Sequence, residues 1–359
     1  QQAKNAVVKM SRRAARNVGL ATPLLRQRWL IGIAILLIFV DVGLFLNTQY
    51  TEKKDRVAAV PLFAEYQKET ADMTNEQAQE YLTDQLNTLS NFQFVQIALN
   101  GEVDEGLLQG LVEENPNILE EYQQAGYEED PLALMTKIQV ISELLGQYQN
   151  VSGYQAYLES IQTQYEQMKD SSFYEGRPYA EAQGKKTTED FAKLQGTEPE
   201  IGMNWGVEAL MEEQISSEIL ILLALGICIV LVSQDRTHDL FGLLRSCRRG
   251  HGCLIAAKFA IALTAVLFLG ISVYGSQIAI AWKLYGMGNL NRPMQSVNEL
   301  NESARQLTVG GYLLDYYLRH LIAVLVLTAF MLCLFLSIYS TMTALVVVGI
   351  CAVLMCRER

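Results

Sequence analysis

The sequence predicts an all-α fold, a polytopic helical membrane protein with a large helical extracellular domain between its first and second spans. Apolar runs of membrane length predict five visible spans, and a sixth is expected. The long polar segment after the first run has helical periodicity, and nothing in it resembles a β-rich domain. Basic and acidic residues also lie in different segments, and this distribution indicates which segments face each side of the membrane.

The chain has 359 residues and a net charge of −11, but its charge is unevenly distributed. Residues 1–28 hold seven cations and no acid, whereas residues 51–215 hold 31 acids against 10 cations. We interpret 1–28 as a cytoplasmic basic tail, either an interfacial helix on the inner membrane surface or a disordered segment. The acidity belongs to one block, which we assign to the extracellular domain, 48–214.

Apolar runs predict the spans. The first span, 29–47, is close to the ~20 residues that cross the hydrocarbon, and only Asp41 interrupts it. The second covers 215–233 and the third 259–283. Residues 319–356 are too long for one span, and hydroxyl side chains near their middle mark a turn between a fourth and a fifth. A secretory signal peptide is the alternative for the first run, but no small-residue cleavage pattern follows it.

Lysine and arginine near the span ends predict the orientation, because they are retained on the cytoplasmic side. The basic tail places the N-terminus in the cytoplasm, and 234–258 returns there as a cation-rich loop. Residues 284–318 then lie outside or re-enter the outer leaflet. Five spans would leave Arg357 and Arg359 outside, against this rule, so we expect a sixth span that this sequence does not include.

The acidic domain reads as a helical bundle. Thr74 and Gln77 have the spacing of a capping box at a helix start. Apolar side chains then recur at three- and four-residue steps from 135 to 168, namely Ile138, Ile141, Leu145, Tyr148, Val151, Tyr154, Leu158, Ile161, Tyr165 and Met168. This pattern predicts a long helix packed against another. A carbohydrate or peptide groove is the alternative, but a bundle core with a solvated acidic face is favoured.

All six cysteines lie outside the acidic domain, so we expect it to be stable without disulfides, which suits a bacterial surface. Cys247, His251 and Cys253 lack the paired spacing of structural zinc, and no metal site is expected. The sequence GKKT at 184–187 lacks the first glycine of a phosphate-binding loop, because Tyr179 stands there. We expect no cofactor on this chain and no nucleic-acid partner. Without a complete phosphate-binding loop the chain cannot bind ATP by that route, so active transport would require ATP hydrolysis by a partner protein.

Asp41 is a carboxylate within a predicted span. Such a group is costly unless it is paired or hydrated. Asp41 could therefore line a pathway or form a hydrogen bond between helices, and the sequence does not decide between them.

Three segments carry a family resemblance over roughly residues 170–345. Before the second span these are Tyr179, Lys186-Thr187, Asp190-Phe191 and Gly206. In the cation-rich loop they are Asp239, Gly242-Leu243-Leu244-Arg245-Ser246, Gly250 and Lys258. After the third span they are Pro293-Met294-Gln295-Ser296-Val297, Leu307-Thr308-Val309 and Tyr312-Leu313. In this order they resemble the membrane subunit of type-2 ATP-binding-cassette (ABC) exporters, in the Gram-positive branch with an enlarged extracellular insertion. Asp239 departs from the family's usual Glu, and His251 from its Arg.

The resemblance implies that the chain is a permease subunit, which uses ATP hydrolysis by a separate ABC ATPase subunit to drive substrate efflux. ATP and Mg would bind to that ATPase subunit. In the loop, a helix over 238–246 would offer apolar side chains to a groove on the ATPase, while arginines meet acidic groups or lipid phosphate. The expected partner-coupling residues are Asp239, Phe241, Leu243, Leu244, Arg245, Arg248, Arg249 and Lys258. The alternative is a solvated loop whose cations only fix the topology.

The other expected partners are the lipid bilayer of a bacterial plasma membrane and a second permease copy or a related permease. Two other functions stay open. A mechanotransmitting permease usually mixes strand and helix in its outer domain, and a transmembrane sensor should continue from its second span into a signalling helix. A membrane-embedded enzyme would need an acid, base or metal cluster that the sequence lacks. The substrate stays open among peptide antibiotics, lipids, polysaccharides and drugs, and so does the domain's role.

Overall fold

The computed structural model describes residues 28–102, 105–126, 131–212, 215–237 and 250–337. Their regular structure is helical, apart from an isolated β-bridge between Pro293 and Thr308, which confirms the all-α prediction for this part of the chain. The chain divides into two compact units. Of the described residues, unit 1 comprises 28–47, 210–212, 215–237, 250–280 and 315–337, and unit 2 comprises 48–102, 105–126, 131–209 and 281–314.

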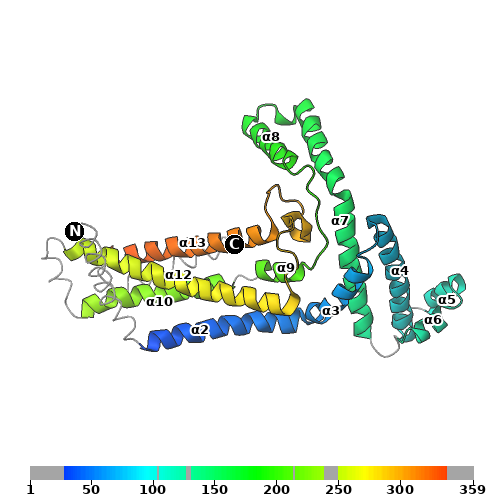
Figure 1. The fold of residues 1–359 in the computed structure, drawn as a ribbon, viewed down its shortest axis with the longest axis horizontal. Coiled ribbons are helices and arrows are strands. Elements are labelled where there is room, and N and C mark those ends of the chain that lie inside the picture. The colour runs from blue at the N-terminus through cyan, green and yellow to red at the C-terminus, as the bar shows by residue number, and fades with distance from the viewer. Residues whose placement is uncertain (1–27, 103–104, 127–130, 213–214, 238–249, 338–359) are drawn as a thin grey trace, which may run out of the picture. The chain divides into compact units, whose positions relative to one another are not determined.

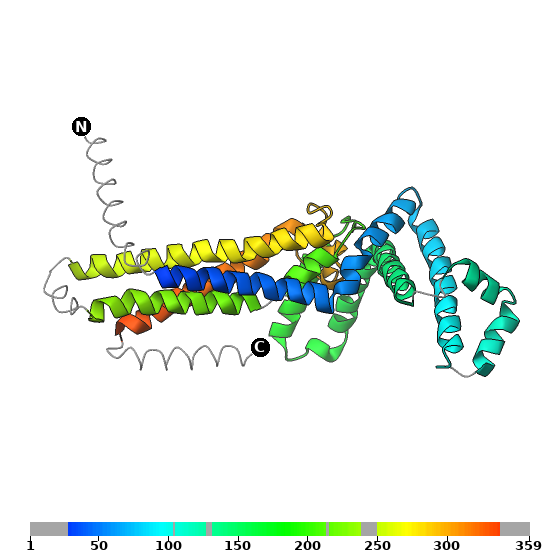
Figure 2. The same cartoon turned by 90° about the horizontal axis from the view of Figure 1, so that it is seen from below.

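Unit 1 is built from long apolar helices, α2 (Arg28–Asn47), α10 (Ile215–Thr237), most of α12 (Gly250–Tyr285) and most of α13 (Val309–Ser337). They run side by side in both views (Figures 1 and 2). The segments Ile31–Glu52, Leu254–Tyr285 and Val309–Ser337 are long and apolar enough to cross a membrane. α10 becomes a fourth candidate when it is joined to α9 (Trp205–Glu212) across residues 213–214.

The helices extend beyond the predicted spans. α12 begins before the predicted third span, 259–283, and α13 begins at Val309, inside the segment 284–318 that was predicted to lie outside. α12 has 36 residues and is therefore about 54 Å long, well over the ~30 Å of hydrocarbon. Apolarity marks only the part of a helix that suits lipid, so it does not locate the helix ends. The tail up to residue 27 and the predicted fifth span lie outside the described residues.

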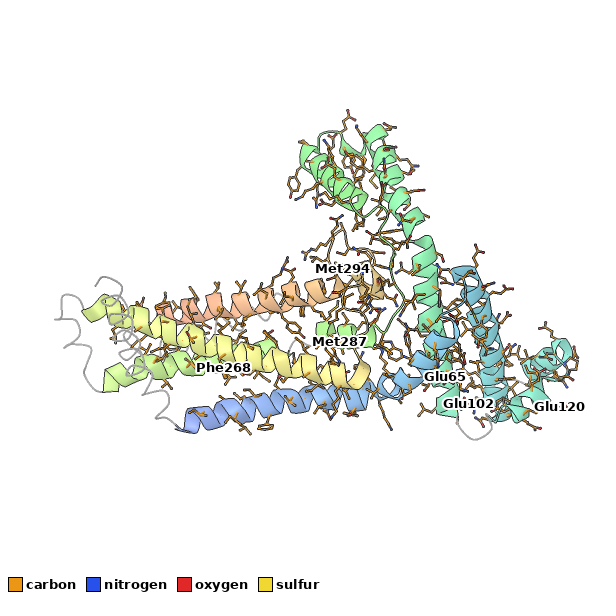
Figure 3. The ribbon with its side chains drawn as sticks, viewed as in Figure 1. Glu65, Glu102, Glu120, Phe268, Met287 and Met294 are labelled. Carbon is orange, nitrogen blue, oxygen red and sulfur yellow. The ribbon has the colours of Figure 1, made fainter. Side chains whose placement is uncertain are left out.

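Large apolar side chains are exposed on unit 1. Phe39 on α2 and Phe268 on α12 (Figure 3) are each 70% exposed, and Val326 on α13 is 64% exposed. Soluble proteins rarely expose so much apolar surface, which is consistent with contact to lipid. Inside the bundle, a Cβ at Gly270 would lie 2.5 Å from Leu321 Cδ1 and 3.3 Å from a methyl carbon of Leu220. The missing side chain lets α12 approach α10 and α13 closely.

Unit 2 is organised around the 40-residue helix α7 (Pro131–Asp170). α3 (Lys54–Glu69) and α4 (Asn75–Leu99) pack on its first half, and α8 (Pro178–Ala192) packs near its C-terminal end (Figure 1). α5 (Glu105–Glu114) and α6 (Ile118–Gln124) pack on α4, and a π-helical turn, Thr48–Glu52, precedes α3. The predicted capping box begins α4, because the Gln77 N–H donates to Thr74 Oγ1 at 3.3 Å and the Thr74 N–H donates to Gln77 Oε1 at 3.1 Å.

α7 contributes to two separate cores. Its first half supplies Ile141 and Tyr148 to a core shared with α3, α4 and α6. Its second half supplies Tyr154 and Leu158 to a smaller core that contains Phe191 of α8. The predicted apolar stripe is therefore a packing surface. Because the stripe continues from one core into the next, α7 connects the two cores of unit 2.

Candidate functional site

A buried cluster of polar side chains lies between the helices of unit 1. We call it the polar cluster, and it consists of Asp41 on α2, Ser216 and Ser217 on α10, Tyr274 and Gln277 on α12, and Tyr317 on α13. Each of these helices contributes at least one member. Polar side chains between apolar helices are costly unless they bond to one another, so helix packing and hydrogen bonding are linked here.

Asp41 is at one side of the cluster and is 2% exposed. Its Oδ1 accepts a hydrogen bond of 2.6 Å from the Ser216 hydroxyl, and the Gln277 side-chain amide donates in turn to Ser216 Oγ. Its Oδ2 is buried and has no hydrogen-bond partner within the described residues. The cluster thus leaves one strong acceptor available, which can take a proton, a cation or a hydrogen-bond donor.

Tyrosines form the other side of the cluster. The hydroxyls of Ser217 and Tyr274 are 3.2 Å apart, and the rings of Tyr274 and Tyr317 have centroids 5.0 Å apart. The Tyr317 hydroxyl donates to the Leu210 carbonyl at 3.4 Å, and the Tyr316 hydroxyl donates to the Met211 carbonyl at 3.3 Å. Those carbonyls lie in the last turn of α9, where helix geometry leaves them without intrahelical donors.

From the sequence, only Asp41 was recognised in this cluster. The structure shows that it makes an interhelical hydrogen bond, which is one of the two roles the sequence allowed. The sequence also contained evidence for the α12 members of the cluster. Tyr274 and Gln277 are polar side chains three residues apart, so they share one face of an otherwise apolar helix. Ser216 and Ser217 carried a weaker signal, since serine is common near the ends of apolar runs.

Of the predicted partner-coupling residues, the structure describes Lys258. The others, Asp239, Phe241, Leu243, Leu244, Arg245, Arg248 and Arg249, lie outside the described residues. Lys258 is 5% exposed, and its ammonium donates to the Leu231 carbonyl at 2.7 Å. This bond joins α12 to α10. A buried ammonium is poorly placed to touch a partner itself, but it fixes the two helices that flank 238–249.

The motif Pro293 to Val297 lies in the segment that connects α12 to α13 within unit 2, where Figure 3 shows Met294. Gln295 is 1% exposed, and its side-chain amide donates to the carbonyls of Ser303 and Arg305 at 3.0 and 2.8 Å. The Ser296 hydroxyl accepts from the Glu200 N–H at 2.9 Å. The glutamine and the serine of this motif therefore hold the segment's own fold and attach it to residues 200–204.

Arg292 precedes this motif and is 1% exposed. Its Nη2 donates to the Met203 carbonyl and to Asn204 Oδ1, both at 2.7 Å, while Nε and Nη1 have no hydrogen-bond partner within the described residues. Burial lowers the pKa of Arg292, and the charge of Glu200 opposes that effect. A side chain on Gly202 would clash with the guanidinium. The glycine therefore makes room for a buried cation that holds two segments of unit 2 together.

The motif that precedes the predicted second span, from Tyr179 to Gly206, is also mainly structural in the described residues. Phe191 belongs to the smaller core of unit 2, and a Cβ at Gly206 would lie 2.9 Å from the Gly286 carbonyl oxygen. Tyr179, by contrast, is 82% exposed.

Within the described residues, no three or more His, Cys, Asp and Glu side chains form a group that could hold a metal ion. Comparison with protein-family models, curated protein sequences and solved structures gives no match for this chain. Its function is therefore argued from its own sequence and geometry.

Proposed function

We propose that this chain is the membrane-spanning permease subunit of an ABC exporter in a bacterial plasma membrane, with its N-terminus in the cytoplasm. It transduces ATP hydrolysis by a separate ATPase subunit, which binds ATP and Mg, into substrate efflux. The observation that carries the proposal is the polar cluster, to which each apolar helix of unit 1 contributes a buried polar side chain.

The polar cluster supports transport because ionisable and polar groups within apolar spans mark pathways for substrates, ions or protons. A bundle that served only as an anchor would gain more from apolar contacts there than from a carboxylate with an unpartnered oxygen. Rocking of the helices would change the Asp41–Ser216 distance, so the same bonds that hold one arrangement can be exchanged in another.

Coupling to the ATPase is assigned to the cation-rich segment between α10 and α12. Phe241 and Leu244 insert into an apolar groove on the partner, and the neighbouring arginines meet acidic groups at its rim. Lys258 supports this role from its buried position, because its bond to Leu231 couples α12 to α10. A displacement of the segment is then transmitted to both helices together.

Unit 2 stands outside the membrane, beside the unit 2 of a second permease copy or of a related permease. Its helices favour an exporter over a mechanotransmitting permease, whose outer domain usually mixes strand and helix. A sensor is less consistent with the chain, because two further apolar helices, α12 and α13, follow α10 where a sensor would continue as a signalling helix.

The proposal is tested by co-expressing the chain with an ABC ATPase from a neighbouring gene of the source genome, purifying the pair and measuring ATP hydrolysis in nanodiscs. Phe241→Ala with Leu244→Ala should prevent the ATPase subunit from co-purifying with the chain, or abolish the stimulation of ATP hydrolysis by the chain. Leu267→Ala with Phe268→Ala is the matched control, since it deletes the same side-chain types from an exposed part of α12. Equal assembly and hydrolysis in both double variants would contradict the coupling role, and failure of the native pair to assemble would contradict the exporter assignment.

A further inference from the structure

Unit 2 contains a cavity of about 220 Å³ on the second half of α7. We call it the tyrosine cavity. It is lined by Asn150, Gly153, Tyr154 and Tyr157 of α7 and by Asn301 and Glu302 of the segment between α12 and α13. Drug-sized ligands usually occupy ~300–1,000 Å³, so this cavity suits a group about as large as one amino-acid side chain.

The lining is electronegative. Tyr154 and Tyr157 have ring centroids 6.2 Å apart with an angle of 35° between the planes, and the faces of both rings carry negative potential. Glu302 adds a full negative charge close by. Burial raises the pKa of Tyr157, and the charge of Glu302 adds to that effect. Within the described residues no basic side chain forms an ion pair with Glu302. A positively charged ligand is therefore favoured over an anionic or neutral one.

Hydrogen-bonding groups of the cavity point to the same ligand class. The Asn150 amide nitrogen donates to the Gln295 carbonyl at 3.2 Å, which leaves its Oδ1 as an acceptor. Tyr154 is 2% exposed, and its hydroxyl has no hydrogen-bond partner within the described residues. Unpartnered buried polar groups are uncommon, and a bound polar group is one explanation for them. An ammonium group offers up to three donors and no acceptor, which complements carboxylate, amide and phenol oxygens.

We propose that the tyrosine cavity binds an organic ammonium group, such as a lysine side chain or a choline headgroup, between the tyrosine rings and the Glu302 carboxylate. Aromatic faces combined with a carboxylate are suited to recognising such cations. The site lies wholly within unit 2 and requires no ATPase, so this inference goes beyond the proposed function and can fail without affecting it.

The test uses the full chain in nanodiscs, titrated by calorimetry with Nα-acetyl-lysine methylamide, with choline and with the neutral Nα-acetyl-norleucine methylamide. A ring contact of about 2 kcal/mol and a charge contact of about 1 kcal/mol should give an ammonium probe a dissociation constant of about 10 mM, and the norleucine probe should not bind. Tighter binding of the lysine probe would identify an amine as the source of the ammonium, and tighter binding of choline would identify a quaternary headgroup. Absence of binding by both ammonium probes would overturn the proposal.

Variants assign the binding to the cavity. Glu302→Gln should weaken ammonium binding by about tenfold and Tyr157→Leu by about three- to tenfold, whereas Tyr157→Phe keeps the ring and most of the affinity. The matched controls are Glu299→Gln and Tyr179→Leu, outside the cavity, and these should bind as the native chain does. Thermal unfolding verifies that each variant is folded. If Glu302→Gln binds with native affinity, or the neutral probe binds as well as the charged ones, the proposal is wrong.

Discussion

The Ser216 hydroxyl donates a 2.6 Å hydrogen bond to Asp41 Oδ1, joining α10 to α2 across 175 positions of the sequence. Both side chains are buried, and Gln277 of α12 donates to the same hydroxyl. The bond connects α2, which precedes the first segment of unit 2 in the chain, with α10, which follows that segment. Substitution of either partner should therefore affect the whole bundle of unit 1.

We predict measurable coupling between Asp41 and Ser216 in a double-mutant cycle of Asp41→Ala and Ser216→Ala. Interhelical hydrogen bonds in membrane proteins contribute about 0.6 kcal/mol on average and up to ~1.7 kcal/mol, and we expect a value in this range. The measurement is the free energy of unfolding in detergent micelles. Asp41→Asn should retain most of the coupling, because its amide oxygen can accept the same bond. Ser272→Ala is the control, since that hydroxyl donates within α12 to the Phe268 carbonyl. Additive effects of the two alanines would contradict the coupling.

Gly206 is predicted to be intolerant of a side chain. Its Cβ would lie 2.9 Å from the Gly286 carbonyl oxygen and 3.2 Å from the sulfur of Met287, and backbone cannot rotate away as a side chain can. Gly206→Ala should therefore lower the unfolding free energy by about 1–3 kcal/mol. Gly146→Ala in α7 is the matched control with the opposite sign, because no atom lies within 4 Å and alanine favours the helix by up to ~1 kcal/mol. Thermal unfolding of both variants is the measurement, and equal shifts would show that the close approach at Gly206 is absent.

Tyr154 is predicted to make stability depend on alkaline pH. Burial, with a smaller contribution from Tyr157, raises the pKa of Tyr154 to about 12 from an ordinary value of 10.0. The unfolded chain then loses its proton first, so the stability associated with the neutral phenol is fully present below pH 10 and declines as the pH rises toward 12. Between pH 9 and pH 11 the native chain should lose about 1 kcal/mol more stability than Tyr154→Phe, which has no proton to lose. Parallel pH profiles for the two proteins would show that the phenol is not buried.

Much of the fold follows from patterns that the sequence displays directly. The apolar runs located α2, α10, α12 and α13, and the stripe from 135 to 168 located α7, because burial against lipid or a core requires a contiguous apolar face. The helix ends could not be located in this way. α13 begins at Val309, ahead of the long apolar run, because the preceding segment is anchored by bonds such as Val309 N–H to the Arg292 carbonyl, which no periodicity encodes.

The candidate site was less predictable because its residues come from separate helices. Asp41 was identifiable by itself, since a carboxylate within an apolar run is unusual. Its pairing with Ser216, and the contact of Tyr274 with Tyr317, depend on how the helices are rotated against one another, and a single sequence does not specify that rotation. The tyrosine cavity was likewise not predictable, because Glu302 and Tyr157 are brought together by the segment between α12 and α13.

Lys258 offers a test that separates coupling from folding. Lys258→Met keeps the length and the apolar contacts of the side chain but removes the donor to the Leu231 carbonyl. Because the substitution removes a buried donor from the Leu231 carbonyl, the unfolding free energy should fall by about 1–3 kcal/mol, which is less than the total stability of a typical domain. Under the proposed function, hydrolysis by the partner ATPase should nevertheless fall several-fold, since α12 would no longer follow α10. Lys283→Met, an exposed lysine in the last turn of α12, is the matched control. Native hydrolysis in Lys258→Met, or a loss that parallels unfolding, would assign Lys258 a purely structural role.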